Sequence, residues 1–461
     1  MLNDLAEFIE IESVLGEPDE NAPFGRENAR ALALFLEKAA AYGLKTGSDG
    51  GYAGWAEYGE GETLIGVLAH LDVVPAGGGW SYDPFRLTVK DGNMYGRGVS
   101  DDKGPLVACL HALARLRREN ADLGCRVRLI AGCNEETGSE CIKHYVRHCE
   151  IPKASFTPDA DFPVVASEKG IAHLKITFPR SEALAEGKIT AQAGTRPNVV
   201  PNAATLLIGR GSPLFDAPAA EFRDVSGLPH AERIAGVLKD YGCDPADFAF
   251  EMTDDGLRVT AHGIAAHGST PEKGDNAAAK ILFMILALTG DESVAAACEY
   301  LAPRDAAERL GIAAEDVTGA LTMNLGVLSA VGGVLSLTVD IRTPACSDYA
   351  DIKRRLAEAL TGAEITELHR SEPLAFDEND TLVSTLLGVY RKVTGDTASR
   401  PLHIGGGTYA KELPNCVGFG AVFPGTDTRM HEPDEFYPVA AFEKLETIYY
   451  EAIKALCAAY R

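Results

Sequence analysis

The sequence predicts an α/β protein: a domain built on a mostly parallel sheet, interrupted by a large inserted α+β domain. Residues 1 to about 168 alternate helical and strand-like segments, which is typical of such a sheet. After about residue 170, short strands of alternating polarity recur between helical stretches, and the α/β pattern returns at about residue 376. We therefore expect one domain formed by 1–168 and 376–461, with 169–375 as a second domain inserted into it.

Two kinds of pattern predict the elements of the first domain. Apolar residues three or four positions apart predict helices, and short apolar or alternating runs predict strands. Leu32, Phe35, Leu36 and Ala39, for example, share one side of the first expected helix. Helices are expected over 28–42, 104–119, 380–393 and 438–459, and strands near 52–58, 63–74, 85–89 and 126–132.

The inserted domain has a different pattern. Residues 170–178 alternate polar and apolar side chains, as a half-exposed strand does. The order of the elements that follow would also fit an inserted domain made of two similar halves. Strands are expected near 188–192, 205–209, 248–252, 257–262 and 334–341, and helices over 230–241, 275–289 and 350–360.

The composition limits the partners and the location of the protein. A net charge of −24 and a pI near 4.9 argue against nucleic acid or an anionic membrane, because both bind surfaces rich in Lys and Arg. No apolar run approaches the roughly 18 residues that span a bilayer, and the first residues do not resemble a secretion signal, so we expect a cytoplasmic protein. The ten cysteines lack a Cys-x-x-Cys spacing, and we expect neither disulfides nor a cysteine-bound metal.

His70 and Asp72 follow the apolar run 64–68, at the end of an expected buried strand. Residues two apart on an extended chain point to the same side, so the imidazole and the carboxylate can face one cleft. Open α/β sheets bind their ligands at such strand ends. A buried pair with satisfied hydrogen bonds is the other interpretation, and the rest of the chain has to decide between the two.

Two pairs of acidic residues lie at other expected element ends. Asp101 and Asp102 occupy a glycine-rich turn before a helix, where Asp is also an ordinary helix cap. Glu135 and Glu136 follow an apolar strand. Neighbouring carboxylates at a buried strand end repel each other unless a cation lies between them, whereas on a solvated helix start the pair would mean nothing.

Two further loops complete the set of charged residues. Asp159 and Asp161 follow a short expected strand, and His431 lies in an acidic loop far along the chain. Together these segments supply nitrogen and oxygen donors and no thiolate. That donor set suits Zn²⁺, Mn²⁺ or Co²⁺.

The order of these motifs resembles the two-metal aminoacylase/carnosinase/carboxypeptidase G peptidase family, and within it the bacterial dipeptidase V branch. The resemblance covers almost the whole chain and implies a zinc-peptidase-type catalytic domain with the inserted domain as a lid. The matching segments are His70-x-Asp72, Gly96-Arg97-Gly98, Asp101-Asp102-Lys103-Gly104, Glu135-Glu136, Thr157-Pro158-Asp159, Ala266-His267-Gly268, Ile404-Gly405-Gly406-Gly407-Thr408 and the late His431.

The resemblance implies two bound divalent ions, zinc or manganese. Asp101 would bridge them. His70 and Asp159 would complete one site, and Glu136 and His431 would complete the other.

The resemblance also implies roles for residues beside the metal ligands. Glu135 would be the general base, and Asp72 would be the carboxylate that orients His70. The peptide bond between Asp101 and Asp102 would be cis.

Further positions resemble the substrate-binding residues of the family. His267 matches a histidine that stabilises the oxyanion, and Asn198 and Arg342 match residues that close over the substrate. Arg suits a carboxylate because it donates two parallel hydrogen bonds. The loop Gly405-Gly406-Gly407-Thr408 would offer its N–H groups to the same carboxylate, although a tight turn is the other interpretation.

Residues and resemblance together predict a metal-dependent dipeptidase that hydrolyses unblocked dipeptides. In the family, Asp at position 159 is associated with aminopeptidase or dipeptidase action and Glu with carboxypeptidase or deacylase action. An N-acyl amino acid deacylase, such as a succinyl-diaminopimelate desuccinylase, is the alternative, and a catalytically inactive binding protein is a further one. Members of the family with short inserted domains dimerise through them and borrow a histidine from the partner subunit. The long insertion here can supply its own histidine, so the resemblance implies a monomer. The remaining histidines are expected to be structural or solvated: residues 111, 144, 148, 173, 230, 262, 369 and 403.

Overall fold

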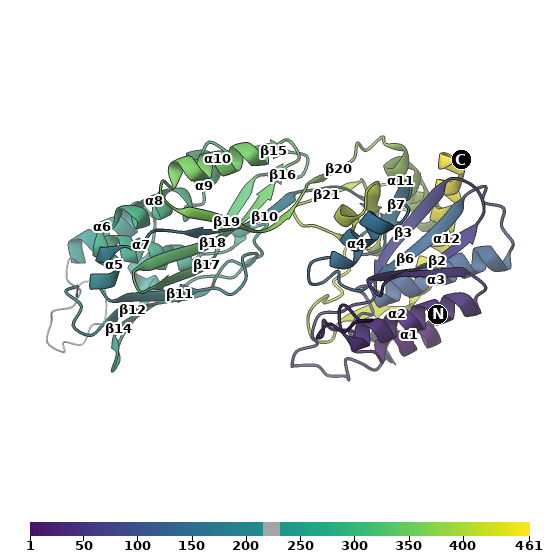
Figure 1. Ribbon diagram of the computed structural model, residues 1–461, viewed down its shortest axis with the longest axis horizontal. Coiled ribbons are helices and arrows are strands. Elements are labelled where there is room, and N and C mark those ends of the chain that lie inside the picture. The colour runs from purple at the N-terminus through teal and green to yellow at the C-terminus, as the bar shows by residue number, and fades with distance from the viewer. Residues whose placement is uncertain (215–230) are drawn as a thin grey trace. The chain divides into compact units, whose positions relative to one another are not determined.

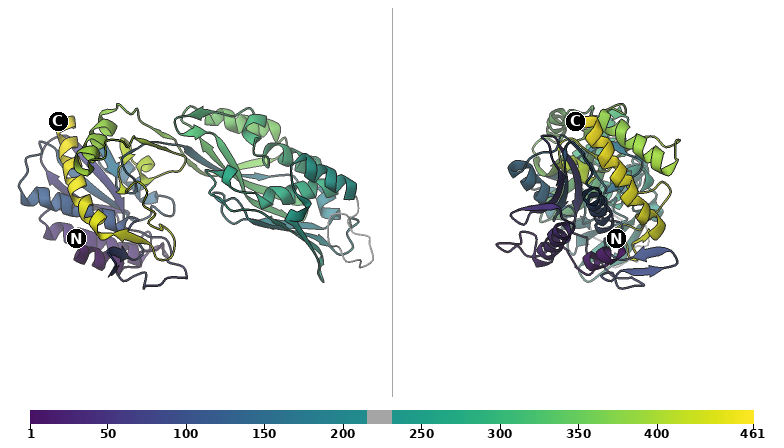
Figure 2. Two further views of the ribbon diagram at one scale, coloured as in Figure 1. Left: turned by 180° about the vertical axis from the view of Figure 1, so that it is seen from behind. Right: turned by 90° about the vertical axis from the view of Figure 1, so that its right-hand side faces the viewer.

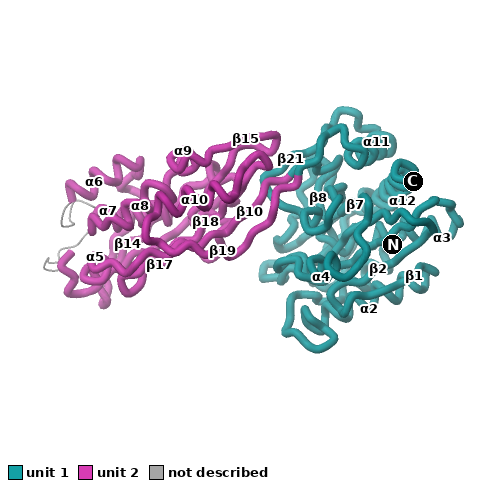
Figure 3. The backbone as a smooth tube through the Cα atoms, turned by 45° about the horizontal axis from the view of Figure 1, so that its top comes forward, with its two compact units in different colours: residues 1–167, 375–461 teal, residues 168–374 magenta. Residues whose placement is uncertain are grey.

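The computed structural model describes residues 1–214 and 231–461. These residues form two compact units (Figures 1 and 3). Unit 1 consists of Met1–Ser167 and Ala375–Arg461, and unit 2 consists of Glu168–Leu374. The boundaries expected from the sequence differ from these by one residue at each end.

Unit 1 is built on a nine-stranded sheet with a parallel centre. The central strands β6, β3, β7 and β22 run parallel to one another, and antiparallel neighbours flank them on both sides. Every residue of β3 is buried, which explains its unbroken apolar sequence. The order is β1 (Lys45–Asp49), β2 (Ala53–Gly59), β6 (Arg126–Gly132), β3 (Leu64–His70), β7 (Ala154–Thr157), β22 (Cys416–Gly418), β9 (Val165–Glu168) and β20 (Leu374–Ala375), with β21 (Leu402–Ile404) paired to β9.

The helices of unit 1 pack around this sheet. α3 and α12 pack on each other and both contact β3, whereas α2 and α4 contact β1 and β2. Figure 2 shows α12 as the long yellow helix at the C-terminus. The helices are α1 (Leu2–Ile9), α2 (Arg26–Ala41), α3 (Lys103–Arg118), α4 (Glu140–His148), α11 (Thr381–Thr394) and α12 (Val439–Tyr460). Short strands form two small sheets: β4 (Thr88–Lys90), β5 (Asn93–Tyr95) and β24 (Phe436–Pro438) in one, and β8 (Ala160–Asp161) and β23 (Ala421–Val422) in the other.

Unit 2 contains an eight-stranded antiparallel sheet. The predicted α/β domain with an α+β insertion is therefore confirmed as the fold class. The order of the strands is β13 (Phe248–Met252), β14 (Gly256–His262), β12 (Ala203–Gly209), β11 (Ile189–Ala193), β17 (Thr322–Val331), β18 (Val334–Thr343), β10 (Gly170–Thr177) and β19 (Glu364–Ser371).

The core of unit 2 lies between this sheet and α7, whose residues are nearly all buried and which contacts β11, β12, β14 and β17. The helices are α5 (Glu182–Glu186), α6 (Ala231–Asp240), α7 (Ala277–Thr289), α8 (Glu292–Tyr300), α9 (Ala306–Arg309) and α10 (Tyr349–Ala359). The helix expected over 230–241 corresponds to α6. Residue 230, where that expected helix begins, lies outside the described residues. In the part of the chain that the structure describes, the helices are too short or too polar to cross a membrane.

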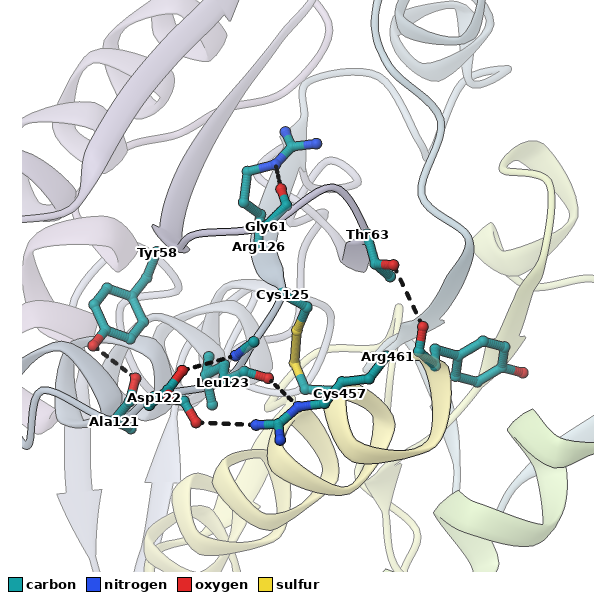
Figure 4. The surroundings of a disulfide bond; sticks show 12 residues. Tyr58, Gly61, Thr63, Ala121, Asp122, Leu123, Cys125, Arg126, Cys457 and Arg461 are labelled. Atoms are coloured by element: carbon teal, nitrogen blue, oxygen red, sulfur yellow. Dashed lines mark hydrogen bonds between the residues drawn. A yellow bond between two sulfur atoms is a disulfide. The ribbon is translucent and has the colours of Figure 1, made fainter.

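The prediction that the chain has no disulfide is wrong. Cys125, just before β6, is bonded to Cys457 near the end of α12, with the two Cα atoms 6.0 Å apart (Figure 4). The end of α12 lies against this loop, where the Arg461 guanidinium donates to the carbonyl oxygens of Leu123 and Asp122 at 2.9 and 3.1 Å. The partners are 332 residues apart in sequence, so local cysteine spacing carries no sign of the pairing.

Candidate metal centre

The carboxyl ends of parallel strands bring charged side chains to one edge of the unit 1 sheet. His70 is the last residue of β3 and lies opposite Gly132, the last residue of β6. Glu135 and Glu136 follow β6, and Asp159 follows β7. These are the strand ends at which open α/β sheets bind their ligands.

One group of potential ligands is centred on His70. Its Nε2 atom lies 2.9 Å from Oδ1 of Asp101 and 3.8 Å from Oδ2 of Asp159. His70 and Asp101 are buried and Asp159 is nearly so. The ligand atoms of the three residues all lie within 4.8 Å of one another, which is close enough to share one metal ion.

A second group uses the other oxygen of Asp101. The Nε2 atom of His431 lies 2.8 Å from Oδ2 of Asp101 and 3.2 Å from Oε2 of Glu136. The two oxygens of one buried carboxylate therefore face two different histidines, which is how a carboxylate bridges two cations. Oε1 of Glu136 is buried without a hydrogen-bond partner, so it has a lone pair left for a cation.

The peptide bond between Asp101 and Asp102 is cis, and this prediction is confirmed. Oδ2 of Asp102 accepts a 3.0 Å hydrogen bond from the backbone N–H of His70. Asp102 thus fixes the end of β3, while Asp101 faces the two histidines.

Glu135 lies beside both groups, with its ligand atoms within 4.8 Å of those of His70 and Glu136. Burial raises the pKa of Glu135 to about 8, and the charges of Glu136 and Asp101 add to the effect, although His70 opposes it. A carboxyl group with such a pKa can take and return a proton near neutral pH.

The pKa values of the proposed ligands show that the cluster stabilises bound protons and therefore positive charge. Hydrogen bonds to Asp101 and Glu136 raise the pKa of His431 to about 10. Burial and the charge of Asp101 raise the pKa of Asp159 well above its ordinary value. Burial opposes ionisation of Asp101 too, yet its hydrogen bonds from His431 and His70 hold its pKa below the usual range.

Asp72 is buried behind the cluster and contacts both sides of it. Its Oδ1 and Oδ2 atoms accept the backbone N–H groups of Glu135 and Glu136 at 2.9 and 3.0 Å. Nδ1 of His70 donates to the backbone carbonyl of Asp72 at 3.0 Å and lies 3.6 Å from its carboxylate. Because Nδ1 keeps its proton, Nε2 is the His70 nitrogen that would give up its proton to Asp101 or solvent and bind a cation beside the carboxylates.

Sequence reasoning missed Glu435, which is completely buried. Its carboxylate accepts hydrogen bonds from Arg97 at 2.7 Å and from the backbone N–H groups of Gly98, Ser100 and Asp101 at 2.9–3.3 Å. It therefore ties the loop that carries Asp101 to the loop that carries the late histidine. Only the acidic character of the segment after that histidine hinted at this role.

The glycine loop leads into Tyr409, another residue that the sequence did not indicate. The Tyr409 ring is buried in a T-shaped contact with the His70 ring, at 5.8 Å between centroids. A Cβ atom at Gly132 would lie 1.9 Å from the Tyr409 hydroxyl, so this strand end requires glycine. Gly406 and Gly407 are at least partly exposed, and Thr408 Oγ1 accepts the N–H of Ala410 in the following 3-10 turn (Tyr409–Glu412).

Three of the predicted residues lie in unit 2 and come together there. The backbone carbonyl of Asn198 accepts the N–H of Gly268, the residue after His267, at 2.7 Å. A Cβ atom at Gly268 would lie 2.5 Å from Oδ2 of Asp340, which pairs with Arg342. The sequence motifs that contain these residues therefore form one group within the inserted unit.

The ring of His267 has a defined tautomer. Its Nδ1 atom accepts the backbone N–H of Ser269 at 3.2 Å and lies 2.7 Å from the Ser269 hydroxyl. The proton of the neutral ring is therefore on Nε2. Burial and the charge of Arg342 lower the pKa of His267, which favours this neutral form with one N–H to donate.

Arg342 is nearly buried and already has a partner. Its Nε and one terminal nitrogen donate to the carboxylate of Asp340 at 2.9–3.1 Å. This ion pair fixes the guanidinium in one orientation and occupies two of its N–H groups. The others remain for a further acceptor.

Comparison with known proteins agrees with this geometry. The model of Peptidase family M20/M25/M40 matches residues 66–455. A Bacillus subtilis (strain 168) protein named "Putative dipeptidase YtjP" is 33% identical over 469 residues, covering 99% of this chain and 97% of its own.

Solved structures share the fold at low sequence identity. An M20 family metallo-carboxypeptidase from Sulfolobus solfataricus has a TM-score of 0.58 at 18% identity and covers 99% of both chains. Human carnosine dipeptidase 1 has a TM-score of 0.56 at 16% identity, covering 99% of this chain and 96% of its own. From its sequence and its fold, the chain belongs to peptidase family M20/M25/M40.

Proposed function

We propose that this protein is a metal-dependent dipeptidase that hydrolyses unblocked dipeptides. The observation that carries the proposal is the carboxylate of Asp101, whose two oxygens face His70 and His431, with the high-pKa carboxyl group of Glu135 beside them. This arrangement suits two-metal hydrolysis, with a positioned base next to the ions. The named relatives of the chain support dipeptides as the substrate class.

The donor set fits two divalent ions such as zinc or manganese. Buried carboxylates are costly without a compensating charge, and Oε1 of Glu136 is buried without a partner. His70 and Asp159 would hold one ion, Glu136 and His431 would hold the other, and Asp101 would contribute one carboxylate oxygen to each. When bound, two such ions supply Lewis acidity that lowers the pKa of a water molecule and polarises a carbonyl group.

The chain's own groups handle the protons. Glu135, as a carboxylate, takes the proton of the attacking water and then donates it to the leaving amine. Asp72 holds the backbone of Glu135 and its neighbour in place through two hydrogen bonds. The raised pKa of Glu135 brings its proton affinity close to that needed for both transfers.

Residues of the predicted binding set are assigned to the substrate. His267 donates its Nε2–H to the carbonyl oxygen as negative charge develops there. Arg342 and Asn198 bind the substrate, with Arg342 oriented by Asp340. The N–H groups at Gly406, Gly407 and Thr408 bind the substrate's carboxylate.

A substrate panel tests the proposal. Purified protein supplied with Mn²⁺ or Zn²⁺ is expected to cleave unblocked dipeptides and to leave N-succinyl and N-acetyl amino acids intact. Hydrolysis of the blocked amino acids alone would identify a deacylase instead. Metal binding with no turnover of either class would identify a binding protein.

We also propose that the protein acts as a monomer, because its long insertion carries its own His267. Light scattering is expected to give the 49.0 kDa mass of one chain. A mass of twice that value would contradict the proposal.

A further inference from the structure

A further group of potential metal ligands lies in unit 1, and it shares no residue with the centre described above. Asp49 is the last residue of β1, and His144 and His148 lie on α4. One ligand atom from each of the three residues lies within 4.8 Å of the other two. The sequence alone gave no reason to connect Asp49 with two histidines almost a hundred residues away.

The distances in this group match a coordination sphere. Nδ1 of His144 lies 3.2 Å from Nδ1 of His148 and 2.6 Å from Oδ2 of Asp49. Ligands bound tetrahedrally at about 2.0–2.1 Å from a zinc ion lie about 3.3 Å from each other. The 3.2 Å between the two imidazole nitrogens matches this separation, and the 2.6 Å hydrogen bond between Asp49 and His144 lengthens when an ion takes the place of its proton.

The neighbouring structure holds these rings in place. The ring of Tyr52 stacks on His144 at 3.9 Å between centroids, with the planes 6° apart. His148 is one helical turn further along α4, so both rings project from the same side of the helix. Asp49 is mostly buried, with 14% of its side chain exposed, and it accepts a hydrogen bond from Nδ1 of His144. A cation bound here would neutralise this carboxylate.

We propose that Asp49, His144 and His148 bind one additional transition-metal ion of the Zn²⁺ type, independent of the two ions of the catalytic centre. Two imidazoles and one carboxylate favour such an ion over Mg²⁺ or Ca²⁺, which prefer oxygen ligands alone. Water fills the remaining position. The ion joins the end of β1 to α4, the helix that begins shortly after Glu136.

Binding requires the Nδ1 atom of His144 to lose the proton that it donates to Asp49, so that the neutral ring carries its proton on Nε2. It also requires a change of tautomer at His148. Its Nδ1 atom lies 2.8 Å from the carbonyl oxygen of His144, to which it donates when protonated. To bind the ion through Nδ1, the neutral ring carries its proton on Nε2, and the ion replaces this hydrogen bond. The exposed position of His148 allows that proton to face solvent.

The test compares the metal content of two variants with that of the unmodified protein. Each is stripped of metal, dialysed to equilibrium against Zn²⁺ and analysed for bound zinc per chain. His148→Ala removes an exposed ligand. His111→Ala is the matched control, because His111 also pairs with an aspartate, Asp4, at 2.8 Å and lies beside a tyrosine, but has no second histidine next to it.

The unmodified protein and His111→Ala are expected to bind equal amounts of zinc, and His148→Ala one equivalent less per chain. Dipeptide turnover of His148→Ala is expected to stay unchanged, which separates this ion from those of the catalytic centre. Asp49→Asn is expected to weaken zinc binding at this position while keeping the size of the side chain. Equal zinc content in His148→Ala and the unmodified protein would overturn the proposal, as would equal losses in both histidine variants.

Discussion

The buried carboxylates around His70 form an arrangement that a protein without bound cations stabilises poorly. Asp101 lies within a few ångströms of both Glu136 and Asp159, and burial raises the pKa of Glu136 and Asp159. Like charges at this separation favour protonation of one partner or the binding of a cation. The cluster therefore favours the binding of divalent cations.

Glu135→Gln tests the division between base and ligands. Glutamine keeps the size of the side chain but cannot accept a proton at neutral pH. We expect turnover to fall by about 10²–10⁴-fold, which is the usual contribution of a general base, with metal content unchanged. Metal analysis and turnover on one preparation check both points, and a loss of metal would show that Glu135 is a ligand.

The affinity of the centre for metal is expected to rise with pH. In the metal-free protein the pKa of His431 is raised to about 10, so its ring is protonated at neutral pH. The pKa of Asp159 is raised too, mainly by burial, so its carboxyl group keeps its proton to higher pH than an ordinary aspartate does. These protons must leave before the groups can bind a cation, so acid weakens binding and alkali strengthens it. Calorimetry in buffers of different ionisation enthalpy measures the protons released. Binding that is tighter at lower pH would contradict this account.

Much of the centre could be predicted from sequence because its residues follow strands in recognisable motifs. His70, Glu135 and Asp159 each come after an apolar run, and parallel strands bring such positions to one edge. Glu435 could not be predicted, since its importance comes from accepting backbone N–H groups of a loop more than three hundred residues earlier. In the sequence, Glu435 is one of several acidic residues in a loop, and nothing there indicates that it is buried.

At the scale of the elements, the loop between β6 and α4 depends on a residue that follows β3. Asp72 accepts two backbone N–H groups of this loop, at Glu135 and Glu136. Asp72→Ala is expected to lower turnover strongly and to leave most of the metal bound, because the ligands themselves remain. Asp72→Asn keeps one acceptor oxygen, and its loss of turnover is expected to be smaller. Equal turnover in Asp72→Ala and the unmodified protein would show that the loop between β6 and α4 keeps its conformation without Asp72.

The C-terminal helix is fastened to the sheet by the bond between Cys125 and Cys457. A bridge that closes a long loop restricts the unfolded chain and typically contributes about 3 kcal/mol to stability. Cys457→Ser is therefore expected to unfold at lower denaturant concentration than the unmodified protein under non-reducing conditions. The difference should disappear when both are reduced. An unchanged midpoint without reductant would contradict the contribution of this bond.

The elements that sequence patterns identified are those with a clear buried side. The helix expected over 28–42 and the strand near 126–132 correspond to α2 and β6. In contrast, α4 has only nine residues, of which Cys141, Ile142 and Tyr145 are buried, and β19 is mostly exposed, so the helix is too short and the strand too polar to be recognised from its pattern. Their formation depends on packing within the folded units, which local patterns do not describe.

For the molecule as a whole, family membership and the buried cluster support the same account. The matched region, 66–455, begins within β3 and ends within α12, so it includes parts of both segments of unit 1 and all of unit 2. The predicted ligands come from both segments of unit 1, since His431 follows the insertion. The first unit therefore needs both parts of the chain to build its site.

Stepwise reconstitution tests the central claim most directly. Metal-free protein carrying His148→Ala, which removes the additional zinc site proposed above, is titrated with Mn²⁺ while cleavage of an unblocked dipeptide is followed. We predict no turnover without metal and a rise that reaches its plateau at two equivalents per chain. Full turnover by the metal-free protein, or a plateau at one equivalent, would contradict a catalytic centre in which Asp101 bridges two ions.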